Sequence, residues 1–163
     1  MLKKLLILIA ASVLSTAVAN AQQTTVVPAV TTPVDPVVAA WQPFTGGVMI
    51  WWSDTRQIWV FTNTGNTIQV MPDTYTEGMP SPQLTAPEGY FTPVRGFGMA
   101  WLLLGGPNSA LGWAMSPEIG YDTAARRATG GAEIVVQGPG NTQYGVTIPA
   151  GAAAGTWRVI AIA

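Results

Sequence analysis

The sequence predicts a β-rich α+β fold, in which two antiparallel β-meanders flank a short helical connector and follow an unstructured tail rich in Thr, Pro and Val. Three observations carry this prediction. Short runs of β-branched and aromatic residues alternate with turns that contain Asp, Asn and Gly. The central segment has apolar residues at helical spacing, and the last third of the chain repeats the strand pattern of the first third.

The first 21 residues have the three parts of a secretory signal. Two lysines precede an apolar stretch over residues 5–19, and small residues, Ala19 and Ala21, stand where signal peptidase must fit. A retained membrane anchor is the alternative, but hydroxyl side chains interrupt an apolar run that is shorter than the about 20 residues needed to span a bilayer. We expect cleavage after Ala21, a secreted or cell-envelope location, and no membrane insertion of the mature chain.

Residues 22–40 contain three prolines and four threonines and almost no charge. Proline fixes φ and removes a backbone donor, so this segment favours extended chain over packed structure. We interpret it as a linker, followed by a single β-rich domain over residues 41–163.

Composition restricts the chemistry of the mature chain. The chain has no histidine and no cysteine, and both lysines leave with the signal, so five arginines face eight carboxylates and the net charge is −3. Histidine- or cysteine-based nucleophilic catalysis, Schiff-base chemistry and histidine-ligated metals are excluded. A chain without a basic stripe is also a poor nucleic-acid binder. We therefore expect no enzyme activity, no cofactor and no metal site.

The first meander is predicted over residues 41–72, with strands at 47–52, 57–62 and 67–71 separated by polar turns. The loop that follows is rich in proline, and Thr74 and Glu77 have the spacing of a capping box, which predicts one helical turn. The connector is predicted over residues 94–118. Its best helix covers 94–104, and the order of Ser116, Pro117 and Glu118 favours the start of another helix.

The second meander is predicted over residues 128–163 as an internal repeat of the first. The Gly-Gly turn at 46–47 is matched by one at 130–131, an offset of 84 residues, and an apolar run follows each turn. Loose strand-turn-strand patterns also match by chance. If the repetition is real, two meanders pack on each other around the connector.

Part of the chain resembles an LGFP repeat. The resemblance covers residues 101–148 and the strand half of a second unit, and the chain differs from the repeat at Ala114 and Ala128. It implies an extracytoplasmic accessory module of the kind that helps to hold exported bacterial proteins at the cell envelope. The matching segments are Leu104–Gly106, Leu111–Trp113, Ser116–Glu118, Thr129–Gly131 with Ile134, and Phe44–Trp52.

Tryptophans are the candidate ligand contacts, because exposed aromatic rings stack on sugar rings. Trp51 and Trp52 are adjacent on a predicted strand and must face opposite sides, so at most one of them joins a given core. Trp59 belongs to the same hairpin, and Trp113 belongs to the connector. The alternative is that all seven tryptophans of the chain fill the core.

Three charged residues have structural and functional interpretations. Arg95 lies between small neighbours and is expected to pair with Asp73, Glu77 or Glu88. Asp73 and Glu77 are closely spaced carboxylates, which could cap a turn, hold a hard cation or hydrolyse a glycoside. The sequence favours the structural roles.

Together these observations favour a non-catalytic exported module of the bacterial cell envelope that binds cell-wall polysaccharide or peptidoglycan through exposed tryptophans. A structural or protein-binding module with buried tryptophans is one alternative. A glycan hydrolase that uses only carboxylates is the other.

Overall fold

A computed structural model describes residues 37–124, 126–128 and 132–160. The predicted signal segment, most of the predicted linker and the second Gly-Gly turn lie outside the described residues. Within the described part, no helix has the length and apolar character needed to cross a membrane.

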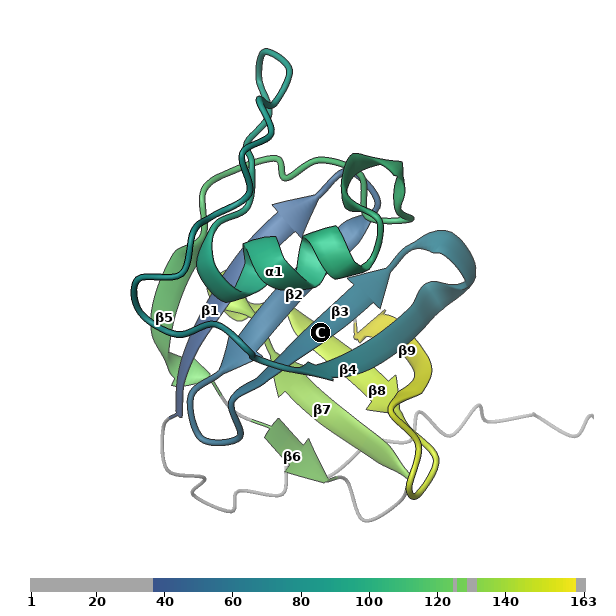
Figure 1. Cartoon of the computed structure of the whole chain (residues 1–163). Helices are drawn as coiled ribbons and strands as arrows, with labels where there is room; N and C mark the ends of the chain where they lie inside the picture. The colour runs from purple at the N-terminus through teal and green to yellow at the C-terminus, as the bar shows by residue number, and fades with distance from the viewer. Residues whose placement is uncertain (1–36, 125, 129–131, 161–163) are drawn as a thin grey trace, which may run out of the picture. The chain divides into compact units, whose positions relative to one another are not determined.

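The described strands form one antiparallel sheet in the order β5-β1-β2-β3-β4-β9-β8-β7-β6. The sheet is curled into a half-barrel, and its two end strands, β5 and β6, are separated in the chain by one residue (Figure 1). The β-rich class and the predicted pair of meanders are thereby confirmed. The strand bounds are β1 Val37–Phe44, β2 Gly47–Trp52, β3 Gln57–Thr62, β4 Thr67–Pro72, β5 Ile119–Ala124, β6 Arg126–Ala128, β7 Glu133–Gln137, β8 Gln143–Thr147 and β9 Ala154–Ile160.

Strands β1–β4 form the first meander, which is buried on both faces. Successive side chains of a strand point to opposite faces, and here both sets are apolar. In β2, Ile50 and Trp52 face the inside of the curl, whereas Met49 packs outward with Trp51 beside it. The near-continuous apolar sequence of β2 and β3 follows from this two-sided burial.

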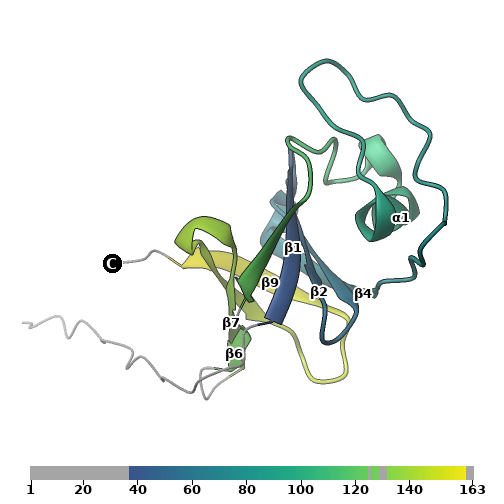
Figure 2. The same cartoon turned by 90° about the vertical axis from the view of Figure 1, so that its left-hand side faces the viewer.

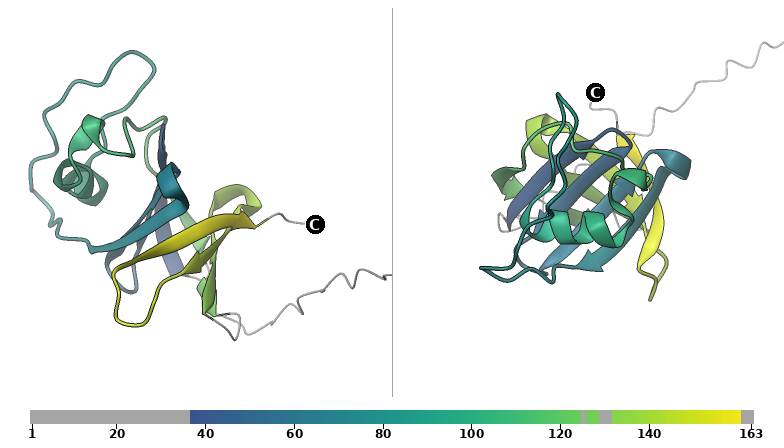
Figure 3. Two further views of the ribbon diagram at one scale, coloured as in Figure 1. Left: turned by 90° about the vertical axis from the view of Figure 1, so that its right-hand side faces the viewer. Right: turned by 45° about the horizontal axis from the view of Figure 1, so that its top comes forward.

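The second meander contains β7, β8 and β9, and it joins the first through antiparallel pairing of β4 with β9 (Figure 3). Its inward side chains complete the inner core. Trp157 contacts the rings of Phe61 and Tyr144 at 5.6 and 5.7 Å between centroids, and its Nε1 donates to the carbonyl of Thr62 at 2.9 Å.

Helix α1, Arg95–Leu103, covers the outer face of the first meander. Figure 2 shows α1 on one side of β1 and β2, with β7 and β9 on the other side. Phe97 and Trp101 are buried between the helix and the sheet. The Nε1 atom of Trp101 donates to the carbonyl of Gly112 at 2.7 Å, which attaches the following loop to the helix.

The connector differs from the prediction in three places. Residues 74–77 contain no helical turn, because the Asp73 carboxylate already accepts the backbone N–H of Tyr75. Residues 116–118 lead into β5 and start no helix, since Trp41 pairs with Ile119 and draws the chain into the sheet. Strand β1 begins at Val37, inside the predicted linker, because Ala39 and Ala40 are buried opposite Trp52 and Trp51.

The two meanders have the same strand order, as the internal repeat predicts. Strands β2, β3 and β4 correspond to β7, β8 and β9, and the two last strands pair with each other. The three-residue 3-10 helices fall in different turns, Thr64–Asn66 between β3 and β4 but Pro139–Asn141 between β7 and β8. The repeat is therefore one of topology, with local differences in the turns.

Candidate functional site

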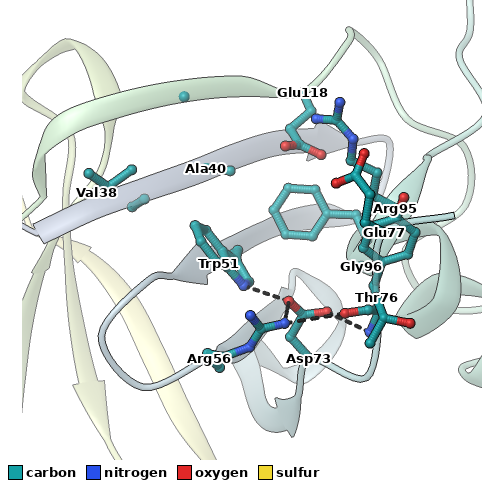
Figure 4. A pocket seen from close by; sticks show the side chains of 14 residues that line it. Val38, Ala40, Trp51, Arg56, Asp73, Thr76, Glu77, Arg95, Gly96 and Glu118 are labelled. Carbon is teal, nitrogen blue, oxygen red and sulfur yellow. Dashed lines mark hydrogen bonds and ion pairs between the residues drawn. The ribbon is translucent and has the colours of Figure 1, made fainter. Parts of the chain in front are cut away.

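A groove of about 570 Å³ opens on the outer face of the first meander, beside the start of α1 (Figure 4). Its floor comes from β1 and β2, and its rim comes from the β2–β3 turn, the segment after β4, the first turn of α1 and the start of β5. The lining residues that carry the argument are Trp51, Arg56, Asp73, Glu77, Arg95 and Glu118.

Asp73 organises one end of the groove. Its Oδ2 accepts Trp51 Nε1 at 2.9 Å and Arg56 Nη2 at 3.4 Å, and its Oδ1 accepts the backbone N–H of Tyr75 at 3.0 Å. The Asp73 side chain is only 7% exposed, whereas that of Arg56 is 61% exposed. These bonds fix the indole plane of Trp51 at the groove wall before any ligand binds.

Gly96 makes room for this arrangement. A Cβ atom on Gly96 would lie 2.6 Å from Asp73 Oδ1 and 3.3 Å from the Ile58 side chain, which is closer than packed atoms allow. The glycine weakens the helix as a helix but lets the carboxylate reach Trp51. This explains why a helix that covers the core begins with such a poor helix former.

Both arginines of the groove have a left-handed backbone. Arg56 and Arg95 each have φ of 50°, a region that residues with a Cβ rarely occupy. Arg56 ends the β2–β3 turn and Arg95 begins α1, so glycine or asparagine would fit either backbone more easily. Such strain is often found at functional sites.

Glu118 and Arg95 lie at the other end of the groove, together with Glu77 (Figure 4). Burial raises the pKa of the Glu118 carboxyl, the nearby Arg95 guanidinium lowers it by less, and the charge of Asp73 raises it further. The Arg95 attraction therefore only partly offsets the loss of water around this carboxylate.

The structure does not bring the four predicted tryptophans to one surface. Trp51 is half-buried and lines the groove, whereas Trp52 is fully buried in the inner core and is not available to a ligand. Trp59 is 6% exposed and borders a separate hollow between β4 and the β8–β9 loop. Trp113 packs on Trp101 at 5.2 Å, under the loop that follows α1.

The predicted polar residues do meet, although in a different pairing. Arg95, Asp73 and Glu77 all line the groove. Among the described side chains, however, the ion pair of Asp73 is with Arg56 rather than with Arg95. Arg95 instead acts electrostatically on Glu118, a residue that the sequence placed at a helix start.

Arg56 and Glu118 are the groove residues that sequence reasoning missed. Continuing the predicted β3–β4 hairpin by one position puts Arg56 opposite Asp73, as the pairing of Gln57 with Pro72 shows, so this signal was present. Glu118 reaches the groove through the pairing of β5 with β1, between segments about 80 residues apart. No local pattern reports such a contact.

The groove combines an aromatic wall with both hydrogen-bond donors and acceptors. The two guanidiniums donate, the three carboxylates accept, and Trp51 presents an apolar surface between them. The described residues contain no group of three or more His, Cys, Asp or Glu side chains placed to hold a metal ion. The arrangement is suited to holding a polar ligand with an apolar face.

No protein-family model, no curated protein and no solved structure matches this chain. The resemblance to an LGFP repeat therefore stays a prediction.

Proposed function

We propose that this protein is a non-catalytic exported module that associates with the bacterial cell envelope and binds cell-wall glycan in the groove beside Trp51. One observation carries the proposal. The Trp51 indole is held by the buried Asp73 carboxylate at the wall of a 570 Å³ groove whose rim offers charged donors and acceptors.

The chemistry of sugars fits these features. A pyranose ring has an apolar C–H face that stacks on an indole, and hydroxyl groups around its edge that both donate and accept hydrogen bonds. Arginines and carboxylates along one rim can satisfy both kinds of bond. The volume lies within the about 300–1,000 Å³ that is usual for small-ligand sites.

The envelope location rests on the sequence. The secretory signal over residues 1–21 and the LGFP-like segments support export and attachment near the cell wall. Mass spectrometry of the exported protein checks this part, with Gln22 expected as the mature amino terminus. A chain recovered only in the cytosol with Met1 intact would contradict it.

Glycan binding is tested by co-sedimentation with purified cell walls and by tryptophan emission during titration with soluble wall fragments. We expect the mature protein to sediment with walls, and the Trp51→Leu variant to lose that retention while its circular dichroism is unchanged. Trp113→Leu is the matched control, since Trp113 is also half-buried but lies outside the groove. Equal retention of both variants would contradict a role for Trp51.

A structural or protein-binding module is the second candidate, and tryptophan burial favours it. Trp52 and Trp101 are 0% exposed and Trp59 is 6% exposed, so these rings act as core. On this hypothesis Trp51 also serves packing alone. Iodide quenching distinguishes the two: wall fragments should shield one tryptophan from quenching if the groove binds glycan, and none if the tryptophans are structural.

A glycan hydrolase that uses only carboxylates is the third candidate. The burial that raises the pKa of Glu118, in the same groove as Asp73, favours it, because glycosidases pair a protonated carboxyl group with an ionised one. Turnover of a glycan panel that Glu118→Gln abolishes would support this candidate. Silence of the wild type on the same panel would support the non-catalytic proposal.

A further inference from the structure

The two ends of the groove differ in charge balance. At the Trp51 end, one carboxylate, Asp73, faces one guanidinium, Arg56, at 3.4 Å. At the other end, two carboxylates, Glu77 and Glu118, share the groove with one guanidinium, Arg95 (Figure 4). The excess negative charge of the groove therefore lies at the Arg95 end.

Glu118 shows that this excess is not compensated within the chain. Burial disfavours its ionised form more strongly than Arg95 favours it, and Asp73 adds to the repulsion. A carboxylate in this position gains from another cation nearby. A bound ligand that carries a positive charge would supply one.

The middle of the groove is apolar. Trp51 and Phe97 lie between the charged ends, over the backbone of β1 at Ala40 (Figure 4). A cation beside an indole is also attracted by the ring quadrupole, at separations up to about 6 Å. A ligand that fits all three parts has a flat apolar body with a cationic group at one edge.

We propose that the groove prefers glycans with free amino groups over neutral and acidic glycans, with an ammonium group seated between Glu77 and Glu118 and its sugar ring on Trp51. This inference rests on the proposed glycan binding and specifies the sugar. N-acetylation of the same sugar removes the charge and leaves the ring, so acetylation state is the property that the groove reads.

An anionic glycan is the main competitor for the site. The first turn of α1 and the Arg95 guanidinium both attract negative charge. Three carboxylates line the same groove, however, and Asp73 already occupies Arg56. An acidic sugar would have to approach Glu77 and Glu118 to reach Arg95, so we expect it to bind more weakly than a neutral one.

The test is isothermal titration of the mature protein with glucosamine, N-acetylglucosamine and galacturonic acid oligomers of equal length, at near-neutral pH and low salt. We expect the glucosamine oligomer to bind about threefold to fivefold more tightly than its N-acetylated form, the size of a partly exposed charge interaction. The difference should shrink as salt is added, because salt screens exposed charges. The galacturonic acid oligomer should bind most weakly.

Charge-neutralising variants locate the effect. Glu77→Gln and Glu118→Gln should each reduce the preference for free amines and leave binding of the N-acetylated oligomer intact. Glu88→Gln is the control, since Glu88 is exposed and outside the groove. Equal affinity for the acetylated and free forms, or a preference that both groove variants retain, would overturn this inference and leave the proposed function standing. Binding of none of the three oligomers would count against both.

Discussion

Asp73 is the residue on which the geometry of the groove depends. It accepts an indole N–H, a backbone N–H and a guanidinium while its side chain is 7% exposed. The Arg56 pair contributes little by itself, because its cation is largely in solvent. The two N–H groups matter more, since a buried donor without an acceptor costs about 1–3 kcal/mol.

The Asp73→Ala variant should therefore be less stable than wild type by about 2 kcal/mol, and its Trp51 ring should lose its fixed orientation. Urea unfolding measures the first effect, and near-ultraviolet circular dichroism measures the second. Glu88→Ala removes an exposed carboxylate from the same long loop and serves as the control. A neutral effect of Asp73→Ala would mean that water replaces the carboxylate.

Glu118 makes stability depend on pH in a defined direction. Because its pKa in the folded protein is raised above the ordinary 4.5, the folded state binds the proton more tightly than the unfolded state. Its contribution to stability is then greatest at low pH and is lost as pH rises through the raised pKa. Ionisation of Glu118 at neutral pH therefore works against folding.

Glu118→Gln removes this dependence. Relative to wild type, the variant should become more stable as pH rises from about 4.5 to neutrality, and the two should converge in acid. Urea unfolding at several pH values measures the difference. A difference that stays constant across this range would show that Glu118 titrates as it does in the unfolded chain.

Sequence reasoning at the residue scale succeeded where strand alternation alone decides the outcome. The opposite facing of Trp51 and Trp52 follows from their adjacency on one strand, and the structure places them on the two faces of the sheet. Which of them stays accessible depends on what covers each face. The inner core covers Trp52, whereas α1 leaves Trp51 at the edge of the groove.

At the element scale, the glycines of α1 were interpreted from the sequence as a weakness of the helix. The structure gives them a packing role. A Cβ on Gly98 would lie 2.7 Å from the Pro82 ring and 2.7 Å from the Pro93 carbonyl. The proline-rich loop before the helix thus lies directly against it, and α1 needs glycine where the two segments touch.

Gly98→Ala should consequently destabilise the protein, although the same change in a free helix stabilises it by about 1 kcal/mol. Overpacking against backbone and a rigid proline ring should cost about 1–3 kcal/mol. Thermal or urea unfolding gives the sign. Met99→Ala, at the next and half-buried position of α1, controls for a general response of the helix to substitution. A stabilised Gly98→Ala variant would show that the loop gives way.

The elements that the sequence missed are β5 and β6. Their residues appeared as connector and as the approach to the second meander, because neither segment has a long apolar run. They are strands because β1 and β7 offer backbone partners. Pairing of this kind is decided by distant segments and leaves little trace in local sequence.

At the scale of the described unit, the two meanders share one inner core. Trp157 of the second meander packs on Phe61 of the first and donates to the carbonyl of Thr62, while β4 pairs with β9. Side chains from both meanders, Ile68 and Val146 among them, belong to the same buried cluster. The repeat in the sequence thus describes two halves of one core, and neither half buries its inner face alone.

Unfolding should accordingly be a single transition in which both meanders lose structure together. Truncation of the ring that links them, Trp157→Ala, should lower the free energy of unfolding by about 3 kcal/mol and keep the transition cooperative. Tryptophan emission, which senses mainly the first meander and α1, should coincide with far-ultraviolet circular dichroism, which senses all strands. Two separate transitions in wild type would mean that the halves fold independently, and the shared core could not then be what holds the groove in place.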